Sequence, residues 1–187
     1  MASDALTETC VAGHTIPGTR FLDVRRDTVS LPSGREGERE YIVHPGAVLV
    51  LPLLDDGRLV LERQFRYPLK QVFIELPAGK IDPKETPLLT GQRELLEETG
   101  YQASEWIHLG AMHPCIGYSD EIIHIYLARG LQAGQHRRDL DEALELFEAG
   151  LDDCLAMVQR GEISDGKTII ALYWLEKFLQ GQWLPQA

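Results

Sequence analysis

The sequence predicts an α/β fold, an α/β/α sandwich with a mixed β-sheet, preceded by an N-terminal antiparallel strand pair. Apolar runs of strand length alternate with amphipathic helical segments, an order typical of a sheet covered by helices. With 187 residues and 44% hydrophobic content the chain is of one-domain size. We expect a single domain over residues 19–187 and a flexible lead-in over residues 1–18, which lack periodicity.

The first part of the chain has the pattern of two hairpins. Residues 19–31 alternate well enough for a strand and end in a Leu-Pro-Ser-Gly turn, so residues 39–44 are expected to return as its partner. Residues 47–54 form a continuous apolar run, Asp55-Asp56-Gly57 is a turn signal, and residues 58–65 return. The second hairpin should therefore be buried.

The last part of the chain mixes strands with helices. Residues 131–141 are polar and are expected to form a loop. Ser164-Asp165 supplies an N-cap for a final amphipathic helix. The expected strands are residues 106–112, 121–128 and 143–148. The expected helices are residues 151–159 and a last one from about residue 166 or 167 to residue 179.

Between these parts, a loop turns into a helix that carries a cluster of acids. Thr86 can serve as the N-cap and Pro87 as the first helical residue, because that position has no intrahelical partner for an N–H. Leucines at helical spacing follow, and Gly100 suits the left-handed residue that closes a helix. We therefore expect the helix to end near Thr99.

Three glutamates on this helix predict a metal site. Glu94, Glu97 and Glu98 stand at i, i+3 and i+4, so their carboxylates share one face and repel unless a cation compensates. Clustered carboxylate oxygens suit a hard divalent ion such as Mg²⁺ or Mn²⁺. Arg93 can reach back to Glu85 and hold the loop against the helix. Taken alone, the three glutamates would also fit a solvated acidic face.

The full pattern over residues 79–101 is Gly, five residues, Glu, seven residues, then Arg-Glu-Leu-X-Glu-Glu-X-Gly-Tyr. It resembles the Nudix box at every fixed position, so the chain is similar to the Nudix hydrolases. This resemblance implies a Nudix-type fold and a Mg²⁺ or Mn²⁺ cofactor. It also implies Glu94 and Glu98 as principal metal ligands, Glu97 as a ligand or water partner, and the Ala78 carbonyl as a further ligand.

Residues outside the box resemble one branch of this family, the ADP-ribose and sugar-nucleotide pyrophosphatases. The segments that carry the resemblance are residues 62–68, 75–79, 114–121 and 165–168. Arg66 would contact phosphate or ribose, a role suited to its fork of donors. In this branch residues at the positions of Arg39 and Glu40 hold the base, often across a homodimer interface built from the N-terminal strands, here residues 19–45. The substrate-binding residues that the resemblance implies are Arg66, Arg39, Glu40, Glu75 and Glu121. Lys167 and Thr168 are interpreted as structural residues at a helix start.

The implied reaction is hydrolysis of ADP-ribose to AMP and ribose 5-phosphate, by attack of water at phosphorus. Catalytic roles are expected for Arg93, Glu97, Glu98 and a general base from a loop. Glu142, just before the strand at residues 143–148, is the candidate base. The alternatives are Asp139, Asp141 and Glu145. Two other functions stay open: hydrolysis of GDP-mannose or another nucleotide sugar, and a Nudix-fold module that senses ADP-ribose without cleaving it.

The composition of the chain argues against some classes of binding partner. The 18 basic and 29 acidic residues give a formal charge of −11, which argues against nucleic-acid and anionic-membrane partners. The N-terminus lacks the pattern of a signal peptide and no apolar run has membrane-spanning length, so we expect a cytoplasmic protein. Cys10, Cys115 and Cys154 are widely spaced and are expected to be reduced; the role of Cys115 stays open.

Overall fold

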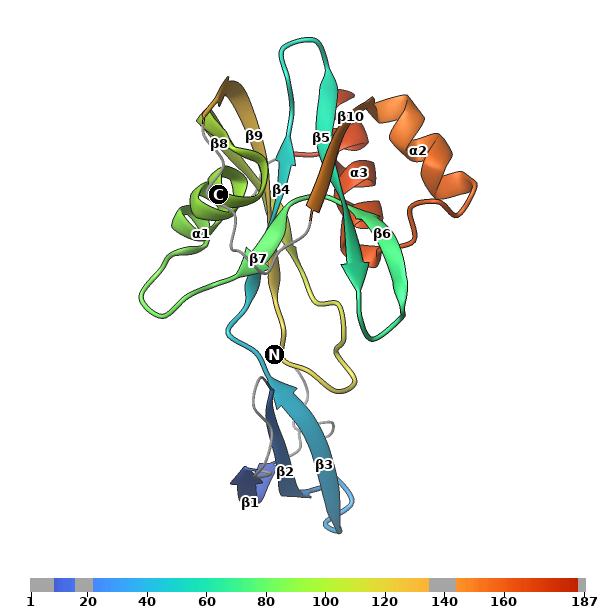
Figure 1. Cartoon of the computed structure of the whole chain (residues 1–187). Coiled ribbons are helices and arrows are strands. Elements are labelled where there is room, and N and C mark those ends of the chain that lie inside the picture. Colours follow the sequence, from blue (N-terminus) through green and yellow to red (C-terminus); the bar gives the residue numbers. More distant parts are fainter. Residues whose placement is uncertain (1–8, 16–21, 135–143, 185–187) are drawn as a thin grey trace. The chain divides into compact units, whose positions relative to one another are not determined.

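The strands of the chain form three sheets in the computed structural model, which describes residues 9–15, 22–134 and 144–184 (Figure 1). Residues 1–45 and 115–122 group into one unit, and residues 46–114 and 123–187 group into a second. The expected α/β architecture, with a mixed sheet and an N-terminal antiparallel strand pair, is confirmed. The single domain over residues 19–187 stays a prediction.

The first unit is built on an antiparallel sheet with the order β1-β2-β3. Its strands are β1 (Thr9–Thr15), β2 (Asp23–Ser30) and β3 (Glu36–Val43). The predicted hairpin of β2 and β3 is confirmed, and its turn is closed by a hydrogen bond from the Leu31 N–H to the Arg35 carbonyl, 2.8 Å. Strand β1 was not predicted, and it lies within the segment for which we expected no regular structure.

Residues 115–122 complete this unit by pairing with the end of β3. The Ile42 N–H donates to the Tyr118 carbonyl over 2.9 Å, and Ile42 and Ser119 form a parallel bridge. The His44 N–H donates to Asp120 Oδ1 over 2.7 Å. A loop expected only to separate two strands therefore supplies backbone pairing to the N-terminal sheet.

The second unit contains two sheets and the helices that cover them (Figure 1). One sheet has the order β7-β4-β9-β8, with β4 and β9 parallel and the other pairs antiparallel; the other sheet is antiparallel with the order β10-β5-β6. The strands are β4 (Ala47–Pro52), β5 (Arg58–Arg66), β6 (Gln71–Glu75), β7 (Ala78–Lys80), β8 (Tyr101–Met112), β9 (Ile123–Ala133) and β10 (Leu144–Gly150). The helices are α1 (Pro87–Glu94), the π-helix η2 (Leu95–Thr99), α2 (Leu151–Gln159) and α3 (Gly166–Leu179).

Strands β4 and β5 were expected to form a buried hairpin, and this was wrong in part. Strand β4 is buried throughout and β5 is buried over residues 59–62, and a tight turn joins them, with the Gly57 N–H donating to the Leu54 carbonyl over 3.0 Å. They pair only through an isolated bridge between Leu53 and Leu59, and then enter different sheets. The reason is that the two edges of β4 are taken by β7 and β9, so β5 pairs with β6 and β10 instead.

The sheet that contains β4 is covered by helices on both faces. Val48 and Val50 pack with Leu95 of the π-helix on one face. Because side chains alternate along a strand, Leu49 and Leu51 point to the other face, where the main core includes residues of α3 such as Leu172 and Leu175. Figure 1 shows α1 beside β8 and β9, with α2 and α3 beside β5 and β10. No described helix is long and apolar enough to cross a membrane.

The N-terminus of α3 is tied to the end of β6. Asp165 caps the helix by accepting from the Thr168 N–H over 3.0 Å, as the sequence predicted. The buried Thr168 hydroxyl accepts from the Leu76 N–H over 3.0 Å. These contacts place Lys167, the residue before Thr168, next to Glu75 at the end of β6.

Candidate active site

The acidic helix begins as predicted and ends in a conformation that was not predicted. The Thr86 hydroxyl accepts from the Leu89 N–H over 3.4 Å, and Pro87 is the first helical residue. The sequence pattern did not predict that α1 passes into a π-helical turn at Leu95. That turn ends at Thr99, before Gly100 with φ 77°, so the predicted end point is confirmed. Single π-helical turns occur frequently at functional sites, and this one carries Glu97 and Glu98.

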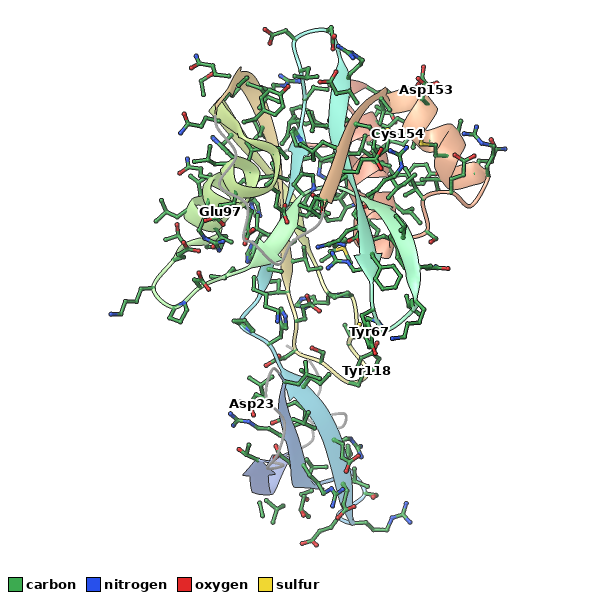
Figure 2. The ribbon with its side chains drawn as sticks, viewed as in Figure 1. Asp23, Tyr67, Glu97, Tyr118, Asp153 and Cys154 are labelled. Atoms are coloured by element: carbon green, nitrogen blue, oxygen red, sulfur yellow. The ribbon has the colours of Figure 1, made fainter. Side chains whose placement is uncertain are left out.

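Arg93 lies at the centre of a group of carboxylates. Its Nε donates to Glu85 Oε1 over 3.0 Å, as predicted, and its Nη1 donates to Glu94 Oε1 over 2.7 Å and to Glu97 Oε2 over 3.0 Å. Nη2 donates to the Lys80 carbonyl over 3.1 Å. Hydrogen bonds to Glu85 and then to Glu97, with the nearby Glu94 charge, raise the pKa of Arg93 despite partial burial. One guanidinium therefore orients carboxylates from both the loop and the helix. Figure 2 labels Glu97, which lies on η2.

The Glu85 carboxylate makes the stability of the fold depend on pH in the acid range. Hydrogen bonds from Arg93 and then from Thr90 lower the pKa of Glu85 from 4.5 to about 2. The stabilising contribution of the ionised carboxylate is therefore fully present above pH 4.5 and is lost as the pH falls towards 2. We expect Glu85→Gln to lower the urea midpoint of unfolding above pH 4.5, with a deficit that shrinks as the pH is lowered.

Urea denaturation of both proteins between pH 6 and pH 2 measures this. Glu105→Gln, which removes an exposed carboxylate from β8, is the matched control. A Glu85→Gln deficit that stays constant across the whole pH range would contradict the role assigned to the Glu85–Arg93 pair.

The two most buried carboxylates of the helix lie against the backbone of β7. Glu98 is 3% exposed, and its Oε2 accepts from the Ala78 N–H over 3.1 Å. At the next residue, Gly79, an added Cβ would overlap the carboxylate of Glu94. Glycine therefore leaves the room that Glu94 occupies, and Ala78 fixes the direction of Glu98.

This arrangement suits a hard divalent ion in its chemistry. All the side-chain atoms here that could bind an ion are carboxylate oxygens, which Mg²⁺ and Mn²⁺ prefer. The backbone of β7 lies next to them. Among the residues that the structure describes, no three His, Cys, Asp or Glu side chains are grouped so as to hold a metal ion as they stand. Arg93 accounts for this, because it holds Glu94 and Glu97 by its own hydrogen bonds.

A second charged group lies where β5, β6 and α3 meet. Arg66 donates from Nε and Nη2 to the two oxygens of Glu75, over 2.7 and 2.8 Å, and Lys167 Nζ forms an ion pair with Glu75 Oε2. Lys167 also contacts Asp165 over 3.0 Å. Burial alone would raise the pKa of Glu75, but Arg66 and Lys167 outweigh it and hold that pKa below its ordinary value. These residues line a cavity of about 280 Å³, to which Leu69 and Phe73 add apolar walls.

The other predicted substrate residues belong to the first unit. Glu40 forms an ion pair with Arg26 across β2 and β3, and Arg39 Nη1 donates to the Glu38 carbonyl over 2.9 Å. Glu121 Oε1 lies 3.8 Å from His44 Nδ1. The structure thus groups Arg39, Glu40 and Glu121 in one unit and the box residues with Arg66 and Glu75 in the other.

The candidate general base lies outside the described residues. Glu142 and the alternatives Asp139 and Asp141 fall in residues 135–143. The remaining alternative, Glu145, has a side chain that is 74% exposed and pairs with Arg63 over 3.1 Å. Glu145 is opposite Arg63 in the β10–β5 register, so it points away from the face of β5 that carries Arg66.

Sequence reasoning missed two residues of the second charged group. Glu62, only 1% exposed, lies opposite Glu75 in the β5–β6 register, so both side chains point to the same face. Lys167 was interpreted as a residue of a helix start, but its amine reaches Glu75. Residues 165–168 belong to the segments that resemble the ADP-ribose and sugar-nucleotide pyrophosphatases, and this could have indicated a role for Lys167. The local sequence does not indicate which strand the first turn of α3 contacts.

Comparison with known proteins gives consistent relatives. A family model described as NUDIX domain matches residues 43–167. The ADP-ribose pyrophosphatase of Bacillus subtilis (strain 168) is 38% identical over 174 residues, which cover 92% of this chain and 94% of that protein. The methanol dehydrogenase activator of Bacillus methanolicus is 40% identical over 161 residues, with 84% and 86% covered. The GDP-mannose pyrophosphatase of Citrobacter koseri is 34% identical over 139 residues, with 70% and 72% covered.

A solved structure, described as the crystal structure of ADP compounds hydrolase, has a similar fold. Its TM-score to this chain is 0.86, and the match covers 96% of this chain and 98% of that one. The two sequences are 23% identical, so the likeness is one of fold.

Proposed function

This chain belongs to the Nudix domain family, and from that premise we propose that it hydrolyses ADP-ribose to AMP and ribose 5-phosphate with the help of a divalent ion. The observation that carries the proposal is the pair of buried carboxylates, Glu94 and Glu98, held against the backbone of β7. An oxygen-rich group of this kind suits an ion that binds a diphosphate. The 38% identity to the Bacillus subtilis ADP-ribose pyrophosphatase supports this substrate over others.

The residues proposed to hold the ion are Glu94, Glu97, Glu98 and the carbonyl of Ala78, with Mg²⁺ as the expected ion and Mn²⁺ as a substitute. When bound, such an ion polarises a phosphoryl oxygen and lowers the pKa of water. Arg93 keeps Glu94 and Glu97 oriented through the hydrogen bonds of Nη1, and the Ala78 N–H does the same for Glu98. These contacts keep the carboxylates beside β7, and Glu94 and Glu97 would turn from Arg93 to the ion when it binds.

Hydrolysis forms a bond from a water oxygen to phosphorus and breaks the bond from that phosphorus to the bridging oxygen. The electron pair of the broken bond stays on the departing phosphate, and the proton of the water passes to a general base. We propose Glu142 as this base. Glu142→Gln should then lower kcat by about 10²–10⁴-fold with a small change in KM. Single-substrate kinetics on the purified variant measure both constants.

The neighbouring acids provide the comparison for Glu142. Asp139→Asn, Asp141→Asn and Glu145→Gln should each stay within a few-fold of the parent protein. Activity of Glu142→Gln within that same range would instead move the role to whichever neighbour fails.

Arg66 is proposed to contact the substrate phosphates or ribose, with Glu75 as its orienting partner. Glu75 binds Nε and Nη2 of Arg66. The third guanidinium nitrogen, Nη1, makes no hydrogen bond to a residue that the structure describes. A guanidinium held along one edge can still donate from the other, as phosphate recognition requires. In the first unit, Arg39 and Glu40 are proposed to hold the base, and Glu121 to contact the terminal ribose or the outer shell of the metal.

A nucleotide sugar such as GDP-mannose is the second candidate substrate, and the 34% identical GDP-mannose pyrophosphatase favours it. Both substrates share the diphosphate that the box and Arg66 would bind. We also propose a cytoplasmic homodimer in which the strands within residues 19–45 meet a second copy. A sensor that binds without cleaving is disfavoured, because the box acids are all present.

Release of AMP from ADP-ribose by the purified protein with Mg²⁺ tests the proposal, beside GDP-mannose, NADH and an oxidised deoxynucleoside triphosphate, with an EDTA control. Rapid, EDTA-sensitive cleavage of ADP-ribose alone is the expected result. Preference for GDP-mannose would overturn the substrate and retain the chemistry. Failure to cleave any of the four, together with measurable binding of ADP-ribose, would favour the sensor.

A further inference from the structure

Two histidine rings on the four-stranded sheet of the second unit face each other through ring nitrogens. Nδ1 of His124, on β9, lies 3.4 Å from Nε2 of His108, on β8. The ring centroids are 5.5 Å apart with an interplanar angle of 37°, and the Tyr126 ring lies 4.9 Å from the His108 ring. Both histidines are half-buried. The pair lies outside the carboxylate group and the Arg66–Glu75 group, and the proposed hydrolysis does not use it.

The register of β8 and β9 brings the rings together. His108 is opposite Tyr126 in the β8–β9 register, and the register then shifts between His108 and Gly110, so that His124 is opposite Ala111. Diagonal neighbours on one face of an antiparallel pair are within reach of ring side chains, and a bulge redirects a side chain locally. The contact between the two histidines is therefore built into the strand pairing.

The separation of the two nitrogens fits two ligands of one metal ion, and as a direct hydrogen bond it would be a long one. Two nitrogens bound to a tetrahedral ion at 2.0–2.1 Å are separated by about 3.3–3.4 Å. A hydrogen bond from a nitrogen normally spans about 2.7–3.2 Å. Burial, and then the neighbouring His108, lower the pKa of His124, which favours the neutral ring that binds metals.

We propose that His108 Nε2 and His124 Nδ1 form a binding site for a borderline divalent ion such as Zn²⁺, Ni²⁺ or Cu²⁺. Imidazole nitrogens suit these ions, whereas Mg²⁺ prefers oxygen ligands, so the site discriminates against the ion proposed for hydrolysis. Binding requires both facing nitrogens to be unprotonated, so each neutral ring would carry its hydrogen on its other nitrogen. In the part of the chain that the structure describes, no third His, Cys, Asp or Glu joins the pair in a metal-holding group, so water completes the coordination.

The strand register also places this site relative to the box. His124 is opposite Val48 in the parallel β4–β9 pair, and Val48 is opposite Gly79 in the β4–β7 pair. Two strand spacings separate the backbones of His124 and Gly79, which is about 10 Å. Val48 packs against Leu95, so the histidine pair lies on the face of the sheet that carries the box helix. An ion bound there is distinct from an ion on the carboxylates.

Nuclear magnetic resonance of the imidazole nitrogens tests the site directly. The ¹⁵N-labelled protein, in excess Mg²⁺ to occupy oxygen sites, is titrated with Zn²⁺ while the ring nitrogens are followed through their long-range couplings to ring protons. We expect His108 Nε2 and His124 Nδ1 to shift together and saturate at one Zn²⁺ per chain. Failure of these two resonances to move at equimolar Zn²⁺ would overturn the proposal.

Calorimetric titration with Zn²⁺ supplies the second measurement. His108→Ala and His124→Ala should each weaken this binding at least tenfold, whereas His113→Ala, which removes an exposed imidazole, should leave it unchanged. An equal loss in His113→Ala would overturn the assignment, because His113 would then be a ligand. Since the resonance experiment uses the unmodified protein, it decides the question even if an alanine variant folds poorly. Neither measurement depends on hydrolysis.

Discussion

Glu98→Gln should lower kcat for ADP-ribose by about 10²–10⁴-fold and leave KM nearly unchanged. Glu98 is the most buried carboxylate of the box helix, and the Ala78 N–H already fixes one of its oxygens. Glutamine has the same shape and can still accept that hydrogen bond, but it lacks the negative charge that a divalent ion requires. The loss should therefore fall on the transition state, where the charge acts, and less on substrate binding. Steady-state kinetics at saturating Mg²⁺ measure both constants.

The matched control for this variant is Glu105→Gln, which makes the same chemical change at an exposed position of β8. Circular dichroism melts of the three proteins separate misfolding from loss of a ligand. Turnover of Glu98→Gln within a few-fold of the parent, with the control also active, would remove Glu98 from the proposed metal site.

Gly79→Ala should reduce turnover by about 10²-fold or more and lower the free energy of unfolding by about 1–3 kcal/mol. The added methyl group would overlap the Glu94 carboxylate, so either the carboxylate or strand β7 must move. Displaced from its place, Glu94 also loses its direction relative to Arg93 Nη1. Activity assays and urea denaturation measure the two effects.

Gly117→Ala is the control for this second variant. A Cβ at Gly117 meets no atom within 4 Å, so the same substitution there adds volume without displacing a side chain. If Gly79→Ala matches Gly117→Ala in both turnover and stability, Glu94 is not held in place by the glycine and its position in the site is not critical.

Sequence patterns predicted most of what is local in this protein. Thr86, Pro87 and Gly100 define the ends of the box helix because capping depends on the residues themselves. Arg93 reaches Glu85 because Glu85 comes just before the N-cap of the helix that carries Arg93. The last helix begins where Asp165 caps it, for the same reason. Such features need only a few neighbouring residues, so they are encoded where they occur.

The features that sequence did not predict depend on partners distant in the chain. Strands β4 and β5 look like a hairpin, but the competition of β7 and β9 for the edges of β4 separates them. Lys167 meets Glu75 only because Thr168 binds the backbone at Leu76, 92 positions earlier. The histidine pair requires His108 of β8 to lie opposite Tyr126 of β9, a register that no local signal at His108 indicates. In each case the sequence indicates the local structure of a segment, but it does not indicate which distant segment lies beside it.

The pairing of early strands with late segments has a consequence for synthesis on the ribosome. Strand β3 acquires its bond from Ile42 only when Tyr118 is available, and β4 acquires its parallel partner only when residues 123–128 of β9 have emerged. Parallel pairs of this kind close long loops and form slowly. At about 5–20 residues per second, the nascent chain would wait several seconds with the apolar run of β4 unpaired on one edge. A chaperone that binds extended apolar segments would then be expected to contact residues 47–52 before β9 emerges.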